Sequence, residues 1–214
     1  DFPEALKYFL EEDDSTRVIA LYIEGIDEPR RLFEIVRQGG LKKPVIAFKA
    51  GKSEKGDSAS RFHTGSLAGN YSIWRGALRQ SFILEVTSAE ELIDTAKTLD
   101  ICASAKGPKI AILSGQAGPG IIAADALEKH GLRLSRFSSK TQERINELLP
   151  PVAIRTNPVD MGPAWYSPET MLDILEAVLD DNETDGVIFI AMFASANLEL
   201  TRRMAGLLRE VEAF

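Results

Sequence analysis

One of the two histidines, His63, lies in a loop rich in glycine and serine that follows the apolar run 45–48. A neutral imidazole is a nucleophile near neutral pH and can hold a phosphoryl group transiently. Gly65 lets backbone amides approach a ligand closely, and the helical pattern that starts near Asn70 offers unpaired N–H groups to an anion. These features predict phosphate chemistry at His63. The alternative is a solvated histidine in a surface loop.

Glu24 directly follows the apolar run 17–23, in the segment Leu-Tyr-Ile-Glu-Gly. In open α/β sheets, ligands bind beyond the carboxyl ends of the strands, so this carboxylate can face the same crevice as the loop after the next strand. A glutamate that accepts the N–H of one ring nitrogen fixes the histidine tautomer and leaves the other nitrogen free to attack phosphorus. We therefore predict that Glu24 orients His63. The alternative is an exposed glutamate at the end of a strand.

A second glycine-rich turn, Ser-Gly-Gln-Ala-Gly-Pro-Gly at 114–120, stands between a predicted strand and a predicted helix. Glycines such as Gly118 and Gly120 permit a tight turn and close approach of backbone amides to a phosphate. Their spacing does not match the G-x-G-x-x-G pattern of dinucleotide-binding proteins, so this turn does not indicate nicotinamide binding. The alternative is a turn without a ligand.

Apolar runs alternate with helical patterns in the first half of the chain. Such runs are typical of strands that are buried on both faces of a parallel sheet. Ser88, with Glu91 three residues later, indicates the beginning of a helix. The predicted strands cover 17–23, 45–48 and 82–84, and the predicted helices cover 2–9, 29–37, 70–79 and 88–99.

The pattern breaks at 103–108 and then starts again. Repeated alternation of strands and helices predicts the α/β class, and the restart predicts two domains, 1–104 and 105–214. In the second domain, the segment 156–162 has the composition of a loop. The predicted strands there cover 109–113 and 186–191, and the predicted helices cover 121–130, 141–149, 168–179 and 197–211.

The composition excludes several classes of protein. No apolar run approaches the ~18 residues of a membrane span, and a net charge of −7 argues against a nucleic-acid surface. Cys102 is the only cysteine, so no internal disulfide can form, and the first residues lack a basic segment followed by an apolar one. We expect a cytoplasmic protein that binds neither nucleic acid nor membrane. Because the chain starts without Met and stops within a helical pattern, we also expect a piece of a longer protein.

Five segments, in this order, carry a resemblance to a known family. They are Leu-Tyr-Ile-Glu-Gly (21–25), His-Thr-Gly-Ser-Leu-Ala-Gly (63–69), Ser-Gly-Gln-Ala-Gly-Pro-Gly-Ile-Ile-Ala-Ala-Asp (114–125), Leu-Pro-Pro (149–151) and Asn-Pro-Val-Asp (157–160). The chain resembles the nucleoside-diphosphate-forming acyl-CoA synthetases, the superfamily that includes succinyl-CoA synthetase and the ADP-forming acetyl-CoA synthetases.

The resemblance implies two flavodoxin-like domains, each a parallel sheet flanked by helices, which correspond to the central CoA-ligase domains of such an enzyme. It also implies that His63 is the phosphohistidine and that Glu24 bonds its ring. The helices after Gly69 and after Gly120 would point their N-termini at the phosphoryl group. The phosphate-binding residues that the resemblance implies are Gly65, Ser66, Gly118 and Gly120.

The implied activity interconverts acyl-CoA, phosphate and ADP or GDP with a carboxylic acid, CoA and ATP or GTP, through an acyl phosphate and a phosphohistidine. CoA, ATP or ADP, and Mg would be bound by partner domains or subunits, namely a CoA-binding domain and an ATP-grasp domain. The enzyme would be an oligomer. We expect no permanently bound cofactor and no metal ligand in this chain. The segment Gly51-Lys52-Ser53 is not a Walker phosphate loop, because position 46 is Ile instead of glycine.

A different class of function stays open at this point. The chain could be a non-catalytic regulatory or ligand-binding module of two α/β domains, as in relatives of these synthetases that are fused to acetyltransferases. The presence of His63 favours the enzyme.

Overall fold

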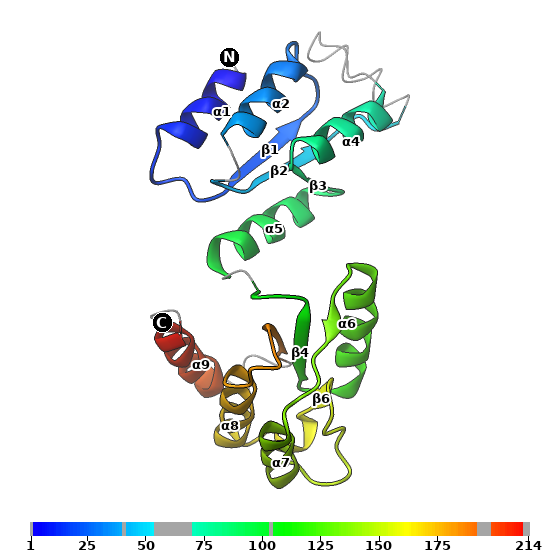
Figure 1. The fold of residues 1–214 in the computed structure, drawn as a ribbon, viewed down its shortest axis with the longest axis vertical. Coiled ribbons are helices and arrows are strands. Elements are labelled where there is room, and N and C mark those ends of the chain that lie inside the picture. Colours follow the sequence, from blue (N-terminus) through cyan, green and yellow to red (C-terminus); the bar gives the residue numbers. More distant parts are fainter. Residues whose placement is uncertain (1, 40–41, 54–69, 103–104, 192–197, 212–214) are drawn as a thin grey trace. The chain divides into compact units, whose positions relative to one another are not determined.

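The structure is a computed structural model, and it describes residues 2–39, 42–53, 70–102, 105–191 and 198–211. The chain divides into two compact units, Asp1–Ala103 and Ser104–Phe214. Each unit contains parallel strands with helices packed around them (Figure 1). The predicted α/β class is therefore confirmed.

Unit 1, Asp1–Ala103, is built around a parallel sheet. Within its described residues, the strands have the order β1-β2-β3. Ile19 pairs with Val45 and Ile23 pairs with Lys49, so β1 and β2 are matched along their whole length. The strands are β1 (Ile19–Ile23), β2 (Val45–Lys49) and β3 (Leu84–Val86), and the helices are α1 (Phe2–Glu11), α2 (Pro29–Gln38), α4 (Tyr71–Gln80) and α5 (Ala89–Ile101).

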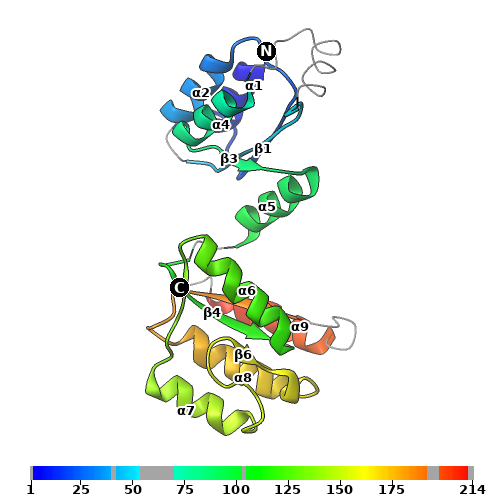
Figure 2. The same ribbon diagram turned by 90° about the vertical axis from the view of Figure 1, so that its right-hand side faces the viewer.

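One face of this sheet carries the core of unit 1. Alternate residues of β1, namely Ile19, Leu21 and Ile23, are buried and pack with side chains of α1, α2 and α4 in one cluster. α5 contacts all three strands, and it lies on the side of the sheet opposite α1 and α2 (Figures 1 and 2). The helices thus sandwich the sheet and leave its carboxyl edge to the loops that follow the strands.

Unit 2, Ser104–Phe214, is organised around β4. This strand pairs with β7 from Ile110 to Ser114, and along its other edge it pairs with β5 at its beginning and with β6 at its end. The strands are β4 (Lys109–Ser114), β5 (Arg133–Leu134), β6 (Val159–Asp160) and β7 (Gly186–Ile190). The helices are α6 (Ala117–Lys129), α7 (Ser139–Leu148), the 3₁₀ helix η1 (Gly162–Ala164), α8 (Pro168–Leu179) and α9 (Leu198–Val211).

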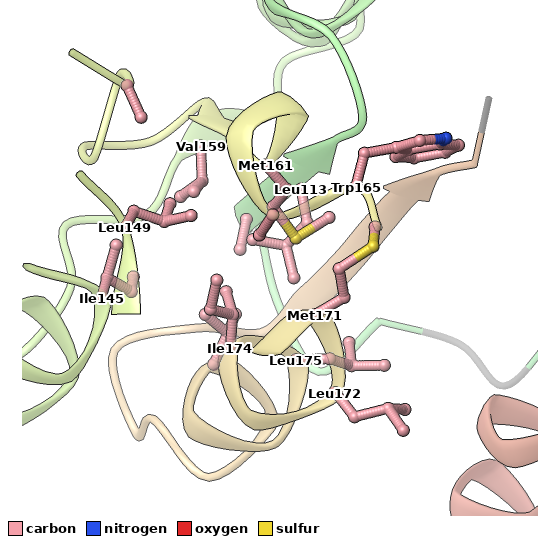
Figure 3. Close-up of a cluster of buried hydrophobic side chains, with 14 of the residues drawn as sticks. Leu113, Ile145, Leu149, Val159, Met161, Trp165, Met171, Leu172, Ile174 and Leu175 are labelled. Atoms are coloured by element: carbon pink, nitrogen blue, oxygen red, sulfur yellow. The ribbon is translucent and has the colours of Figure 1, made fainter. Parts of the chain in front are cut away.

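The main core of unit 2 joins the sheet to α7 and α8. Leu113, Met161 and Ile174 are each 0% exposed, and Figure 3 shows side chains of the strand region and of α8 facing one another. Fully burying an aliphatic side chain of this size contributes about 1.5–3 kcal/mol. The same core extends to Trp165, which is 7% exposed and lies beside the carboxyl end of β4.

The side chain of Asn157 fills a gap in the hydrogen bonding of β4. Between the short strands β5 and β6, the backbone N–H of Ile112 donates to Asn157 Oδ1 at 2.9 Å. Asn157 Nδ2 donates to the carbonyl oxygens of Ile110 at 2.8 Å and Ser135 at 3.1 Å. Because unpaired buried amides are costly, this side chain takes the place of the strand that is missing at this point.

α6 begins at Ala117, four residues before the helix expected at 121–130, so Gly118 and Gly120 lie in its first turn. Pro119 is tolerated there because first-turn amides have no intrahelical acceptor. A Cβ on Gly120 would come within 3.3 Å of the side chains of Pro158 and Ser114. The glycines that suggested a loop therefore belong to a helix that packs very close to the sheet.

β3 begins at Leu84, whereas the apolar run predicted a strand over 82–84. Phe82 has a φ of 57°, and the N–H of Ile83 bonds the carbonyl of Leu78 at 3.0 Å. These residues close the end of α4 instead of extending the sheet. The two-residue strands β5 and β6 were not predicted either; β6 falls inside the segment that we expected to be a loop.

The predicted beginning of the helix at Ser88 is confirmed. Ser88 is the N-cap of α5, and its Oγ accepts the N–H of Glu91 at 3.1 Å. The Glu91 carboxylate accepts the N–H of Thr87 at 2.6 Å, and the bonds from Thr87 lower the pKa of Glu91. Capping explains why this boundary could be predicted to within one residue.

We predict that Asn157→Ala lowers the free energy of unfolding by about 1–3 kcal/mol, because it leaves the buried N–H of Ile112 without an acceptor. Urea unfolding of the chain measures this loss. Asn146→Ala is the matched control, since Asn146 is exposed and its side chain accepts one bond from Gln142 at 3.2 Å. An equal effect of both substitutions would contradict the role given to Asn157.

Candidate functional site

The carboxyl ends of β1 and β2 bring Glu24 and Lys49 together. Ile23, the last residue of β1, pairs with Lys49, the last residue of β2, and Glu24 follows directly. Lys49 Nζ donates to the backbone carbonyl of Glu24 at 2.7 Å, and the N–H of Ala50 donates to the carbonyl of Ile23 at 2.9 Å. Glu24 thus lies at the predicted edge of the sheet, where ligands of α/β proteins bind.

The Glu24 carboxylate accepts a hydrogen bond from a residue of β1, the strand that Glu24 follows. The hydroxyl of Tyr22 donates to Glu24 Oε1 at 3.2 Å. This bond, with a smaller contribution from burial, raises the pKa of Tyr22 above its usual value. Glu24 as a whole residue is half-buried at the edge of the sheet.

His63, Gly65 and Ser66 lie outside the described residues, in the segment that joins β2 to α4. The proposed contact between Glu24 and the His63 ring therefore stays a prediction. The described ends of the segment are Ser53 and Asn70. The segment therefore begins shortly after the last residue of β2, which lies beside Glu24, and it ends at the N-cap of α4.

The N-terminus of α4 is capped by its own chain. Asn70 is the N-cap, and its Oδ1 accepts the N–H of Ser72 at 2.9 Å. The carbonyl of Asn70 also accepts the N–H of Ile73 at 3.0 Å. The helix after Gly69 was expected to point its amides at a phosphoryl group. Because these two amides already have acceptors, α4 has fewer donors left for an anion than an uncapped helix.

The turn after β4 in unit 2 is held by close contacts. The hydroxyl of Ser114 donates to the carbonyl of Gln116 at 2.6 Å, and the N–H of Gly115 donates to the carbonyl of Ile190 at 3.1 Å. A Cβ on Gly115 would lie 2.0 Å from Cζ3 of Trp165. Only glycine fits between this ring and the sheet, so the ring fixes the path of the chain into α6.

The N-terminus of α6 is arranged differently from that of its neighbours. The side chain of its N-cap, Gln116, makes no capping hydrogen bond, whereas Ser138 caps α7 and Ser167 caps α8. Gly118 is exposed, and a Cβ there would meet nothing within 4 Å. First-turn amides with open space around them can bind an anion, which they and the helix dipole stabilise.

Gly120, in contrast to Gly118, lies on the side of α6 that packs against the sheet. It is buried against Pro158 and Ser114, so its lack of a side chain serves the packing of α6 on the sheet. Its predicted phosphate contact could involve only its amide, and it stays a prediction. Gly118 and Gly120 therefore share the first turn of α6 but face different surroundings.

Asp160 and Trp165 are two residues at this edge that were not singled out from the sequence. Asp160 pairs with Ser114 across β4 and β6, and its Oδ1 accepts the N–H of Gly162 at 2.9 Å. Asp160 belongs to the Asn-Pro-Val-Asp motif that carries part of the family resemblance, so the sequence did contain a signal for it. However, we had expected the segment 156–162 to be a loop. For Trp165, no sequence signal was available, because its importance comes from its contact with Gly115.

No group of three or more potential metal-ligating side chains is present in the part of the chain that the structure describes. Among the described helices, none combines the length and apolar character needed to cross a bilayer. The described groups thus comprise a carboxylate at the edge of the unit 1 sheet and an open helix N-terminus at the edge of the unit 2 sheet. They suit the orientation of a base or nucleophile and the binding of an anion, respectively.

Residues 1–99 match the model of the succinyl-CoA ligase-like flavodoxin domain family. The alpha subunit of ADP-forming acetate–CoA ligase II from Pyrococcus furiosus is 37% identical over 99% of this chain and 46% of its own length. ADP-forming acetate–CoA ligase I from Archaeoglobus fulgidus is 40% identical over 85% of this chain and 26% of its own length. The chain thus spans less than half the length of these curated relatives.

A solved structure shows the same arrangement of elements. Dinucleotide-forming acetyl-coenzyme A synthetase 1 from Candidatus Korarchaeum cryptofilum, in complex with phosphate and ADP, superposes with a TM-score of 0.80 at 28% sequence identity. The match includes 95% of this chain and 46% of that chain. These similarities confirm the flavodoxin-like character expected from the sequence. Residues 1–99 therefore belong to the succinyl-CoA ligase-like flavodoxin domain family, and nearly the whole chain is similar in sequence and fold to part of the ADP-forming acyl-CoA synthetases.

Proposed function

We propose that this chain carries the phosphohistidine of an NDP-forming acyl-CoA synthetase, with His63 as the phosphoryl carrier and Glu24 as the group that orients it. The observation that carries the proposal is the position of Glu24. Its carboxylate stands at the carboxyl edge of β1, beside the strand from which the His63 segment departs. The alpha subunit of the Pyrococcus furiosus acetate–CoA ligase, similar over nearly the whole chain, supports the same assignment.

The proposed reaction has three reversible steps. Phosphate attacks the thioester carbon of an acyl-CoA, the bond to sulfur breaks, and CoA leaves as acyl phosphate forms. A ring nitrogen of His63 then attacks the phosphorus of the acyl phosphate, and the carboxylic acid leaves as its carboxylate. Finally, a terminal oxygen of ADP or GDP attacks the phosphohistidine, so ATP or GTP forms and the imidazole is released.

Glu24 acts by accepting the N–H of the ring nitrogen that does not react. This bond selects the tautomer whose other nitrogen is free to attack, and it stabilises the ring when phosphorylation makes it cationic. The hydrogen bond from the Tyr22 hydroxyl restricts the movement of the carboxylate and helps to keep it in position. Glu24 is thus proposed as a group that orients the nucleophile, not as a nucleophile itself.

The phosphoryl group is proposed to bind to backbone amides near Gly65 and Ser66 and to the first turn of α6, near Gly118 and Gly120. A phosphoryl group carries roughly two negative charges, and a helix N-terminus offers about half a positive charge together with unpaired N–H groups. The open space around Gly118 and the missing side-chain cap at Gln116 support this role for α6.

The proposed enzyme needs more than this chain. CoA, ATP or ADP, and Mg would be bound by a CoA-binding domain and an ATP-grasp domain or subunit, in an oligomer that acts in the cytoplasm. The chain spans 46% of the Pyrococcus furiosus subunit, which leaves room for such parts elsewhere in the enzyme. We propose that the substrate is a carboxylic acid of the same class as acetate, which the names of two relatives give as their substrate.

We predict that the complete enzyme, incubated with ATP labelled in its γ-phosphate, acquires an acid-labile and base-stable phosphoryl group on His63. His63→Asn should abolish this label, because an amide cannot form the phosphorus–nitrogen bond of a phosphohistidine. Peptide mapping of the labelled protein checks the position. His130→Asn is the control, since His130 only ends α6. A label that persists in His63→Asn would refute the assignment of the phosphoryl group to His63, and a wild-type enzyme that takes no label would favour the non-catalytic regulatory module.

We predict that Glu24→Gln slows phosphorylation of His63 on the order of 10²-fold, the lower range for the loss of one group that stabilises developing charge, because a neutral amide stabilises the cationic ring less than a carboxylate does. The melting temperature should stay unchanged, because the amide oxygen still accepts the Tyr22 bond. Rapid-quench measurement of the labelling rate tests this.

Glu28→Gln is a matched control for Glu24→Gln. It makes the same chemical change in the same turn, where Glu28 accepts a bond from Arg31 at 3.1 Å. Its labelling rate should equal that of the wild type. Equal rates for all three proteins would remove Glu24 from the mechanism.

A further inference from the structure

Lys49 is a lysine in the interior of unit 1. Its side chain is fully buried, and the residue is 2% exposed. Nζ donates to the carbonyl oxygen of Glu24 at 2.7 Å and to that of Ala50. Removing an ammonium group from water is costly unless hydrogen bonds replace its hydration. The buried ammonium group is therefore stabilised by hydrogen bonds to two backbone carbonyls at the edge of the sheet where Glu24 lies.

A ring of α4 covers the same ammonium group. Nζ of Lys49 lies 5.6 Å from the centroid of the Trp74 ring, and Trp74 is 6% exposed. The Trp74 ring packs edge-on against Phe33 of α2, with centroids 5.5 Å apart. A cation over an aromatic face is attracted more strongly when both are desolvated. Lys49 thus joins three parts of the chain, namely the turn after β1, the end of β2 and the helix α4.

Lys52 makes a second, parallel connection. Its Nζ lies 5.1 Å from the centroid of the Tyr71 ring and 5.6 Å from that of Phe48. The same atom is 3.9 Å from a carboxylate oxygen of Glu85, to which the hydroxyl of Tyr71 also donates. The bond to Glu85, together with burial, raises the pKa of Tyr71. The first turn of α4 is therefore tied to the residues just after β2.

The two connections have the same spacing in sequence. Lys49 and Lys52 are three residues apart, and so are their ring partners Trp74 and Tyr71, which lie on neighbouring turns of α4. We call these four residues the lysine clamp. The clamp joins the end of β2 to the beginning of α4, which are the two ends of the segment that contains His63.

We propose that Lys49 and Lys52 are positioning residues for the reaction at His63, a proposal that rests on the proposed function. Lys49 holds the backbone of Glu24, and both lysines hold the two chain ends between which His63 lies. An apolar side chain could fill the Lys49 site without bringing a charge into the interior. However, an apolar side chain could not donate hydrogen bonds to the carbonyls of Glu24 and Ala50, as Lys49 does.

The test is Lys49→Met in the complete enzyme, because methionine keeps an unbranched stem of similar length and removes the charge. Hydrogen exchange of peptides that contain residues 21–28, 45–53 and 70–78 should become faster, since the amide of Ala50 and the Glu24 turn lose their anchor. The single-turnover rate constant of His63 phosphorylation should fall at least about tenfold, since small misplacements of reacting groups carry large kinetic penalties.

Leu10→Ala is the control for loss of stability alone. Leu10 is 4% exposed and lies near Val45, at the opposite end of β2 from Lys49. This variant should have a lower melting temperature but a wild-type rate constant. A rate constant reports on folded molecules, so it separates a positioning role from a smaller folded fraction.

The outcomes separate the clamp from the proposed function. Unchanged exchange in Lys49→Met refutes the clamp, and faster exchange with a wild-type rate constant refutes its role in positioning. If the wild type takes no label on His63, the proposed function and the positioning role fail together, whereas exchange still decides whether the clamp exists. If Lys49→Met does not fold, Lys52→Met decides by the same two measurements, since the Lys52 side chain is 28% exposed and less important for folding.

Discussion

Full-length parallel pairing of β1 with β2 is the constraint on which the site in unit 1 depends. It places Ile23 beside Lys49 at one edge of the sheet, so the residues that follow both strands emerge together. Glu24 and the chain that leads to His63 are neighbours for this reason. Lys49 then adds a charge-assisted bond to the Glu24 carbonyl, which links the two strand ends more firmly than the sheet alone would. The chemistry proposed at this edge needs such fixed spacing, because a nucleophile and the group that orients it must stay within hydrogen-bonding reach.

In unit 2, close packing against the backbone and hydrogen bonds to it fix the carboxyl edge of the sheet. Gly120 lets α6 approach β4 closely, Gly115 accommodates the Trp165 ring, and Asn157 completes the hydrogen bonding between two strands that are too short to do so. The first turn of α6 is consequently held against a rigid edge while Gly118 stays exposed. The anion site that we propose at this helix N-terminus would have a well-packed support and would need little rearrangement when an anion binds, which favours tight binding.

Much of the fold could be predicted because its signals are local. The buried strands β1, β2, β4 and β7 are continuous apolar runs, and α5 begins at a side-chain cap. Other features depend on contacts distant in sequence, and local patterns gave no warning of them. Glycine in the first turn of α6 is unfavourable for a helix, yet the helix forms because Gly120 packs against Pro158. The two-residue strand β6 exists because Ser114 pairs with Asp160, and its own residues carry no strand pattern.

The sequence by itself determined the α/β class, the order of the long helices and of the buried strands, the resemblance to the NDP-forming acyl-CoA synthetases and the placement of Glu24 at the end of a strand. These follow from apolar periodicity and from short motifs, both of which are properties of neighbouring residues. Only the tertiary structure decided that Lys49 is buried between the Glu24 carbonyl and Trp74, that Asn157 bonds to Ile112, and that Gly120 faces the sheet while Gly118 faces open space. The physical reason is that the surroundings of a side chain come from elements that are distant in sequence, whereas its periodicity reports only on its own element.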